Sequence, residues 1–85
     1  MSTYDNKKNR FVKGKRQGFW EYYRDGKIIS RGNYVDGVLD GHWEVYFNNS
    51  QLCCKVNYKK GIYDGLHEYY NTEGILTESK FYVNI

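Results

Sequence analysis

Residues 18–34 have the sequence GFWEYYRDGKIISRGNY, and the same pattern returns in residues 41–58 and in residues 65–82. Each copy opens with a glycine, carries aromatic residues near a central glutamate, crosses a short polar turn and ends at a tyrosine. Repetition at this length indicates an array of small supersecondary units, each stacked on its neighbour. The residues that close successive units recur at spacings of 23, 24 and 24, and they are Phe11, Tyr34, Tyr58 and Tyr82.

Each unit has the pattern of a β-hairpin. Asp25-Gly26 separates two runs rich in aromatic and aliphatic residues, and a glycine there tolerates the positive φ of a tight turn. The chain has nine glycines and no proline, which favours strands joined by glycine turns. We therefore predict an all-β fold, a single-layer antiparallel β-meander built from about three β-hairpin repeats. The expected strands cover residues 18–23, 28–34, 41–46, 52–58, 65–70 and 75–82.

The chain divides into a short arm and one repeat domain. Residues 1–16 carry a net charge of +5 and the remainder carries −2, so the basic character belongs to the N-terminal end. We expect residues 1–10 to form a flexible basic arm, and we expect residues 11–85 to form a single domain of the size that 85 residues allow. The expected repeats lie at about residues 18–40, 41–64 and 65–85, after a partial repeat at residues 11–17.

Pairing Tyr23 with Ile28 across the first turn fixes a register, and strict alternation then assigns the side chains to two faces. The first face carries Tyr23, Tyr34, their counterparts and the recurring glutamates. The second face places Trp20 opposite Arg31, and one repeat later Trp43 opposite Lys55. Its residues vary more between copies, and they are of the types enriched at interface hot spots. We predict partner binding on this face through Trp20, Tyr22, Arg31, Trp43, Lys55 and Tyr69.

The pattern Gly-x-Trp-x-x-Tyr, a turn with glycine, an aliphatic residue and then Tyr-x-x-Gly-x-x-x-Gly resembles the variant MORN repeat of bacterial, viral and eukaryotic proteins. The resemblance covers residues 11–85, although His67 stands where Trp20 and Trp43 stand and Ser50 replaces the turn glycine. It implies an extended sheet that binds another protein, and it links some members to toxin–antitoxin or immunity systems. The expected function is a non-enzymatic protein–protein interaction module, with a small inhibitor or an antitoxin- or immunity-type binder as its specific form.

Two alternative functions remain open on the sequence. The basic arm would bind nucleic acid or an anionic membrane, with an affinity that falls steeply as salt rises. Aromatic groups on both faces of one small sheet predict a homodimer, and they also allow a structural self-assembling unit. The basic residues of the N-terminal end are Lys7, Lys8, Arg10, Lys13, Lys15 and Arg16.

No catalytic residue, metal site, cofactor or small-molecule substrate is predicted. His42, His67 and Cys53 lack the spacing of a zinc site, which needs three or four convergent ligands. A Cys53 nucleophile with a histidine base is the alternative, but no feature of the sequence lowers the pKa of this thiol. A glutamate recurs in all three repeats, and we interpret these carboxylates as cross-strand charge partners.

The N-terminal residues do not have the pattern of a secretory signal. Residues 1–6 lack the apolar core of a secretory signal, and no segment has the apolar length of a membrane span. Cys53 and Cys54 are adjacent, so they cannot cross-link distant segments. We expect a cytoplasmic protein with both thiols reduced.

Overall fold

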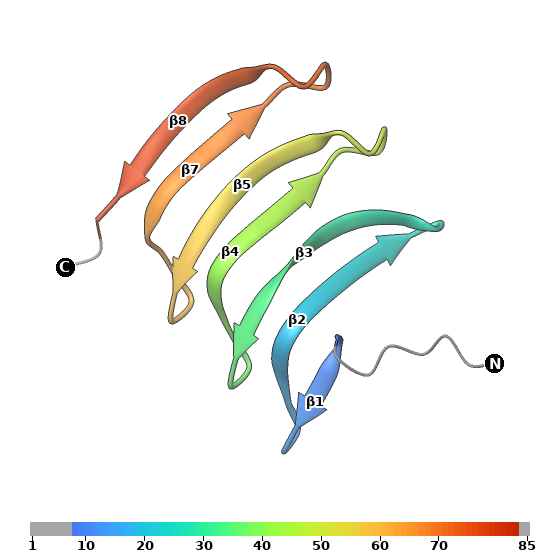
Figure 1. Cartoon of the computed structure of the whole chain (residues 1–85), viewed down its shortest axis with the longest axis vertical. Helices are drawn as coiled ribbons and strands as arrows, with labels where there is room; N and C mark the ends of the chain where they lie inside the picture. Colours follow the sequence, from blue (N-terminus) through green and yellow to red (C-terminus); the bar gives the residue numbers. More distant parts are fainter. Residues whose placement is uncertain (1–7, 84–85) are drawn as a thin grey trace.

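The computed structural model describes residues 8–83, and within this range the chain forms strands and turns without a helix. The strands are β1 (Arg10–Val12), β2 (Lys15–Arg24), β3 (Lys27–Val35), β4 (Val38–Tyr46), β5 (Leu52–Lys59), β6 (Ile62–Tyr63), β7 (Gly65–Tyr70) and β8 (Leu76–Tyr82). They form one antiparallel sheet in the order β1-β2-β3-β4-β5-β7-β8, with β6 paired to β5 (Figure 1). The molecule is 15 Å thick and 42 × 36 Å across. The predicted single-layer meander is confirmed.

The tight turns share one backbone conformation. Asp25 and Gly26 both have positive φ, 50° and 76°, as a type I′ hairpin turn requires. The twist of this turn matches the twist of the strands it joins, so the hairpins stack without splaying. The predicted hairpin at Asp25-Gly26 is confirmed. The same pair of positive φ values recurs between hairpins, at Lys13-Gly14, Asp36-Gly37 and Lys60-Gly61.

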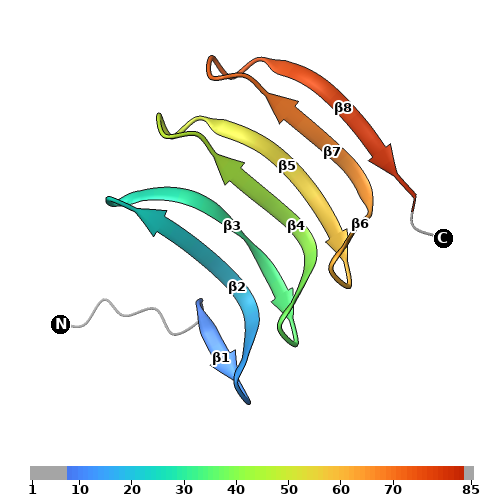
Figure 2. The same cartoon turned by 180° about the vertical axis from the view of Figure 1, so that it is seen from behind.

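The long strands bend where each repeat begins. Gly18, Gly41 and Gly65 have φ between 79° and 88°, a conformation that residues with a Cβ rarely adopt. Figure 2 shows the curvature of β2, β4 and β5 along their length. Rings that precede these glycines in the chain contact rings that follow them. In the first repeat, for example, Phe11 meets Trp20 edge-on at a centroid distance of 5.1 Å.

A one-residue irregularity near the turn of each repeat changes the register. Tyr23 lies opposite Ile28 as expected, but Tyr22 lies opposite Ser30, so Ile29 is an extra residue with no partner in the ladder. Equivalent shifts occur between Val45 and Tyr46 and again in the third repeat. Because side chains alternate with a period of two, one extra residue moves everything beyond it to the other face.

This bulge corrects part of the predicted face assignment. Trp20 lies opposite Gly32 and not Arg31, and Trp43 lies opposite Val56 and not Lys55. The two cations lie opposite glutamates instead. The tyrosines that close the repeats change sides as well, and Tyr34, Tyr58 and Tyr82 join the tryptophans. We call the surface with Trp20, Trp43 and His67 the Trp face, and the surface with Glu21, Glu44 and Glu68 the Glu face.

The predicted arm falls partly within the described residues. Lys8 makes a bridge to Phe19, and Asn9 packs against the outer side of β2 with a backbone hydrogen bond of 2.8 Å to the Phe19 carbonyl. Residues 8–10 are thus attached to the sheet, while Lys7 lies outside the described residues. The described part of the chain contains no helix that is long and apolar enough to cross a membrane.

Candidate partner-binding face

The Trp face holds the core of the protein. Trp20 and Trp43 are 6 % exposed and His67 is fully buried. In a single-layer sheet this burial comes from rings on the same face, because no second layer covers them. Tyr34 stands between the two tryptophans, with edge-on ring contacts at 5.9 Å and 5.4 Å. Tyr63 gives the same cover to His67 at 4.4 Å.

Each buried ring is tied to the preceding unit by the same hydrogen bond. Trp20 Nε1 donates to the Arg10 carbonyl at 3.2 Å, and Trp43 Nε1 donates to the Asn33 carbonyl at 3.1 Å. His67 Nε2 lies 3.0 Å from the Asn57 carbonyl. In each case the acceptor stands ten residues earlier. His67 is therefore the structural equivalent of the tryptophans.

The size of the Trp43 ring is accommodated by Gly32, the residue beside it in the preceding repeat. A Cβ added to Gly32 would lie 2.3 Å from Trp43 Cδ2, so the indole packs directly on the glycine backbone. The equivalent of Gly32 one repeat later is Val56, which lies opposite Trp43 on β4 and, where the β5–β7 register continues, beside the smaller ring of His67 on β7. Gly32, the one glycine outside the repeat pattern, thus makes room for an indole.

The Glu face carries a row of alternating charge across the strands. Glu21 lies opposite Arg31, Arg31 opposite Glu44, Glu44 opposite Lys55, and Lys55 opposite Glu68. Arg31 Nε is 2.7 Å from Glu44 Oε1, and Arg31 Nη1 is 3.8 Å from Glu21 Oε2. These contacts confirm the interpretation as cross-strand charge partners for Glu21 and Glu44, whereas Glu68 is placed opposite Lys55 by the register alone.

Tyrosine hydroxyls fix the first two glutamates of the row. Tyr23 Oη donates to Glu21 at 2.9 Å, and Tyr46 Oη donates to Glu44 at 2.8 Å. Lys8 Nζ adds a 2.7 Å hydrogen bond to Glu21. Each carboxylate therefore has several donors, and its position on the face is determined by the fold.

These contacts favour the ionised forms of Glu21, Glu44 and Arg31. The hydrogen bond from Lys8 is the main reason that the pKa of Glu21 lies below its usual value of 4.5. Burial by itself would raise the pKa of Glu44, but the hydrogen bonds from Arg31 and Tyr46 outweigh it and lower that pKa. The hydrogen bond to Glu44 in turn raises the pKa of Arg31.

A shallow hollow lies beside this row on the Glu face. Its volume is about 260 Å³, and it opens between β2, β3 and β4. Phe19, 41 % exposed, supplies an apolar wall next to the charged groups. The exposed lining of this hollow is mostly apolar, with the ion pair at its rim, so it suits an apolar or aromatic side chain of another protein. Its lining residues are Phe19, Arg31, Gly32, Asn33, His42 and Glu44.

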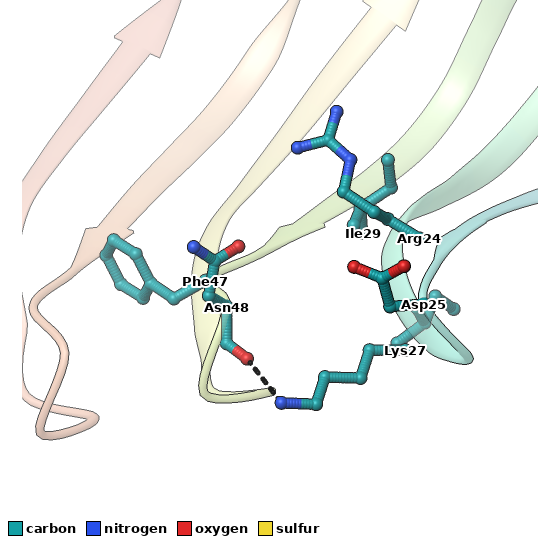
Figure 3. A pocket seen from close by; sticks show the side chains of 7 residues that line it. Arg24, Asp25, Lys27, Ile29, Phe47 and Asn48 are labelled. Atoms are coloured by element: carbon teal, nitrogen blue, oxygen red, sulfur yellow. Dashed lines mark hydrogen bonds between the residues drawn. The ribbon is translucent and has the colours of Figure 1, made fainter.

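A second hollow of about 240 Å³ lies between the tips of the first two hairpins (Figure 3). Lys27 Nζ spans it and donates to the Asn48 carbonyl at 3.4 Å. Arg24 and Asp25 line the other side. This contact joins the turns of neighbouring repeats, and we interpret it as structural.

The six residues predicted to bind a partner do not share a surface. Trp20, Tyr22, Trp43 and Tyr69 lie on the Trp face, where Tyr22 stacks on Trp43 at 6.3 Å. Arg31 and Lys55 lie on the Glu face. Sequence reasoning missed Phe19, Asn33 and His42; the bulge brings Arg31 and Asn33 to the side of Phe19 and His42. The variable residue after each opening glycine was the available signal, and it is Phe19, His42 and Leu66.

The basic residues of the N-terminal end are partly engaged within the protein. Lys8 forms an ion pair with Glu21. The Arg16 guanidinium stands over the Trp20 and Tyr34 rings at 5.1 Å and 5.9 Å. Arg10, Lys13 and Lys15 are exposed around the β1–β2 turn.

The described residues contain no group of three or more His, Cys, Asp and Glu side chains that could hold a metal ion. Cys53 and Cys54 are free and half-buried. Burial, followed by the neighbouring Cys53, raises the pKa of the Cys54 thiol to about 11. Cys54 is thus protonated at neutral pH and a poor nucleophile.

Comparison with known proteins identifies the repeat. The model of the MORN repeat variant matches residues 14–36 and 39–60, which together make up more than half of the chain. The matched segments contain Trp20 and Trp43, whereas the third repeat with His67 lies beyond them. No curated protein and no solved structure matches the chain.

Proposed function

This chain belongs to the MORN repeat variant family, and from that premise we propose that it is a protein-binding module whose Glu face receives one partner protein. MORN repeats generally mediate binding to proteins or membranes. The observation that carries the choice of face is the hollow between Phe19 and the Arg31–Glu44 ion pair. The largest rings of the Trp face are buried within the protein itself, so they offer little area to a partner.

The charge row supports one partner of complementary pattern. Fixed charges of alternating sign reject a surface of uniform sign and favour one register of binding. The exposed apolar groups beside the row, Phe19 and Tyr23, supply area that a partner can bury. We propose that the complex is stoichiometric and inhibitory, of the antitoxin or immunity type, and that it forms in the cytoplasm.

A matched pair of arginine variants tests the face. Affinity purification from the native host identifies the partner, and calorimetry measures its affinity for each variant. Arg31→Ala removes a cation from the Glu face, and we expect binding to weaken by about 1–3 kcal/mol, as at interface hot spots. Arg16→Ala removes a cation near Trp20 on the Trp face, and we expect binding to stay within about twofold of the wild type once folding is verified.

The same pair addresses the basic-arm alternative. Loss of binding in Arg16→Ala but not in Arg31→Ala, with affinity that falls steeply as salt rises, would assign the function to the arm and to a polyanionic ligand. Normal binding by both variants would refute the Glu face assignment.

A further inference from the structure

The two edges of the sheet differ. At the N-terminal edge, β1 pairs with part of β2, and Asn9 continues the cover with its side chain. The Asn9 amide donates to the Glu21 carbonyl at 3.0 Å, and its Oδ1 accepts from the Glu21 N–H at 2.7 Å. This amide therefore occupies the place of a neighbouring strand. Among the described residues, no strand pairs with the outer side of β8 at the other edge (Figure 1).

The outer side of β8 is equivalent to surfaces that are covered elsewhere in the sheet. β3 and β5 hold the same place in the first two repeats, and β4 and β7 cover their outer sides. Lys80 stands where Gly32 and Val56 are buried. Next to it, Phe81 and Val83 are each 71 % exposed. An edge strand with free backbone groups and exposed apolar side chains can accept another strand.

The sequence of β8 complements itself in one antiparallel register. If two copies meet with Ser79 on the two-fold axis, Glu78 lies opposite the second copy's Lys80, and Lys80 lies opposite the second copy's Glu78. Thr77 then lies opposite the second copy's Phe81, a β-branched residue against an aromatic one. Glu78 and Lys80 already approach to 3.5 Å within one chain, so both charges stand on the same side of β8.

We propose that β8 is a homodimerisation edge, at which two copies of this chain pair antiparallel around Ser79 into one continuous sheet. A slip of two residues in either direction places Glu78 against Glu78 or Lys80 against Lys80, and like charges directly opposite are destabilising. The charges thus select one register, where charges on an edge strand otherwise discourage pairing. Head-to-tail growth onto β2 is blocked because Asn9 and β1 occupy that edge.

Charge reversal tests the register without removing the strand. Glu78→Lys puts lysines at both positions of each strand, and Lys80→Glu puts glutamates at both. We expect the wild type to sediment as a dimer of the 10.2 kDa chain. Each single variant should be monomeric at the same concentration. An equimolar mixture of the two should restore the dimer, because every lysine then faces a glutamate.

Several controls keep the outcome decisive. The double variant with both substitutions should dimerise as the wild type does, and thermal melts show whether each variant folds. A wild type that stays at 10.2 kDa at high micromolar concentration overturns the proposal. Single variants that dimerise normally would also overturn the proposal, and an assembly larger than a dimer would do the same. The measurement uses the purified protein alone, so its result is independent of whether the Glu face binds another protein.

A cross-linking variant locates the two-fold axis. In a Cys53→Ser, Cys54→Ser background, Ser79→Cys places two thiols opposite each other, and we expect rapid disulfide formation with diamide. Phe81→Cys in the same background is the matched control, because its thiol would face the second copy's Thr77. Equal cross-linking rates for the two variants would reject the Ser79 register.

Discussion

Gly32 and Val56 hold the same place in successive repeats, but the rings beside them on the following strand differ in size. On the following strand, Trp43 packs directly on Gly32, whereas the smaller ring of His67 lies beside Val56. The sequence departures His67 and Gly32 are therefore two sides of one packing rule. The two residues of such a pair lie on the last strand of one repeat and the first strand of the next. The effect of a substitution at either position on stability therefore depends on the residue across the repeat boundary.

A size exchange at this boundary tests the rule. Gly32→Val drives a side chain into the Trp43 ring, and we expect the free energy of unfolding to fall by about 1–3 kcal/mol, as for other overpacked cores. The double variant Gly32→Val, Trp43→His reproduces the Val56–His67 pair, and we expect it to regain part of the free energy of unfolding that Gly32→Val loses. Urea denaturation of the two single variants and the double variant gives the coupling energy. Strictly additive effects would contradict the size rule.

Glu44 makes the protein sensitive to acid. Its pKa is lowered in the folded state, so its ionised form stabilises the fold above the usual pKa of 4.5, and this contribution is lost as pH falls through the folded pKa. We expect the urea midpoint to fall below pH 4.5 in the wild type and to fall less in Glu44→Gln. Glu73→Gln, in an exposed turn, should keep the acid dependence of the wild type. Identical profiles for the wild type and Glu44→Gln would contradict this role.

At the scale of the strand, the hairpins were predictable and the bulges were not. The glycine turns and the period of 23–24 residues indicate the order of the hairpins, but β2 and β4 begin at Lys15 and Val38, three residues before the predicted starts at Gly18 and Gly41. The extra residue is Ile29 in one repeat, Cys53 in the next and Thr77 in the third, so no shared residue type marks it. Missing it left the tryptophans and glutamates on their correct sides but moved Arg31 and Lys55 to the wrong face.

The edge cap on β2 is a second feature that periodicity could not predict. It depends on one side chain, Asn9, which precedes the first unit of the repeat. We expect Asn9→Ala to lower the free energy of unfolding by about 1–2 kcal/mol, because two hydrogen bonds of about 0.5–1.5 kcal/mol each are lost. Asn48→Ala in an exposed turn is the control and should change stability little. An unchanged melting temperature in Asn9→Ala would show that the cap does not stabilise β2.

At the scale of the whole molecule, each hairpin contacts only its neighbours, so stability should be graded along the sheet. We expect backbone amides in β4 to exchange most slowly with deuterium, since β3 and β5 cover it on both sides. Amides on the outer side of β8 should exchange fastest in dilute solution and slow down as the concentration rises. Uniform exchange across all strands would indicate one cooperative unit in place of a graded array.

The partnership of Gly32 with Trp43 also restricts how such a gene can change in length. A recombination event that removed residues 41–64 would keep the repeat period and every glycine turn, yet it would place Gly32 against His67. The smaller ring would leave a void where the indole had been, and voids in a core are costly. Repeats that look equivalent in the sequence are therefore not exchangeable, because the packing between repeats depends on the order in which they follow one another.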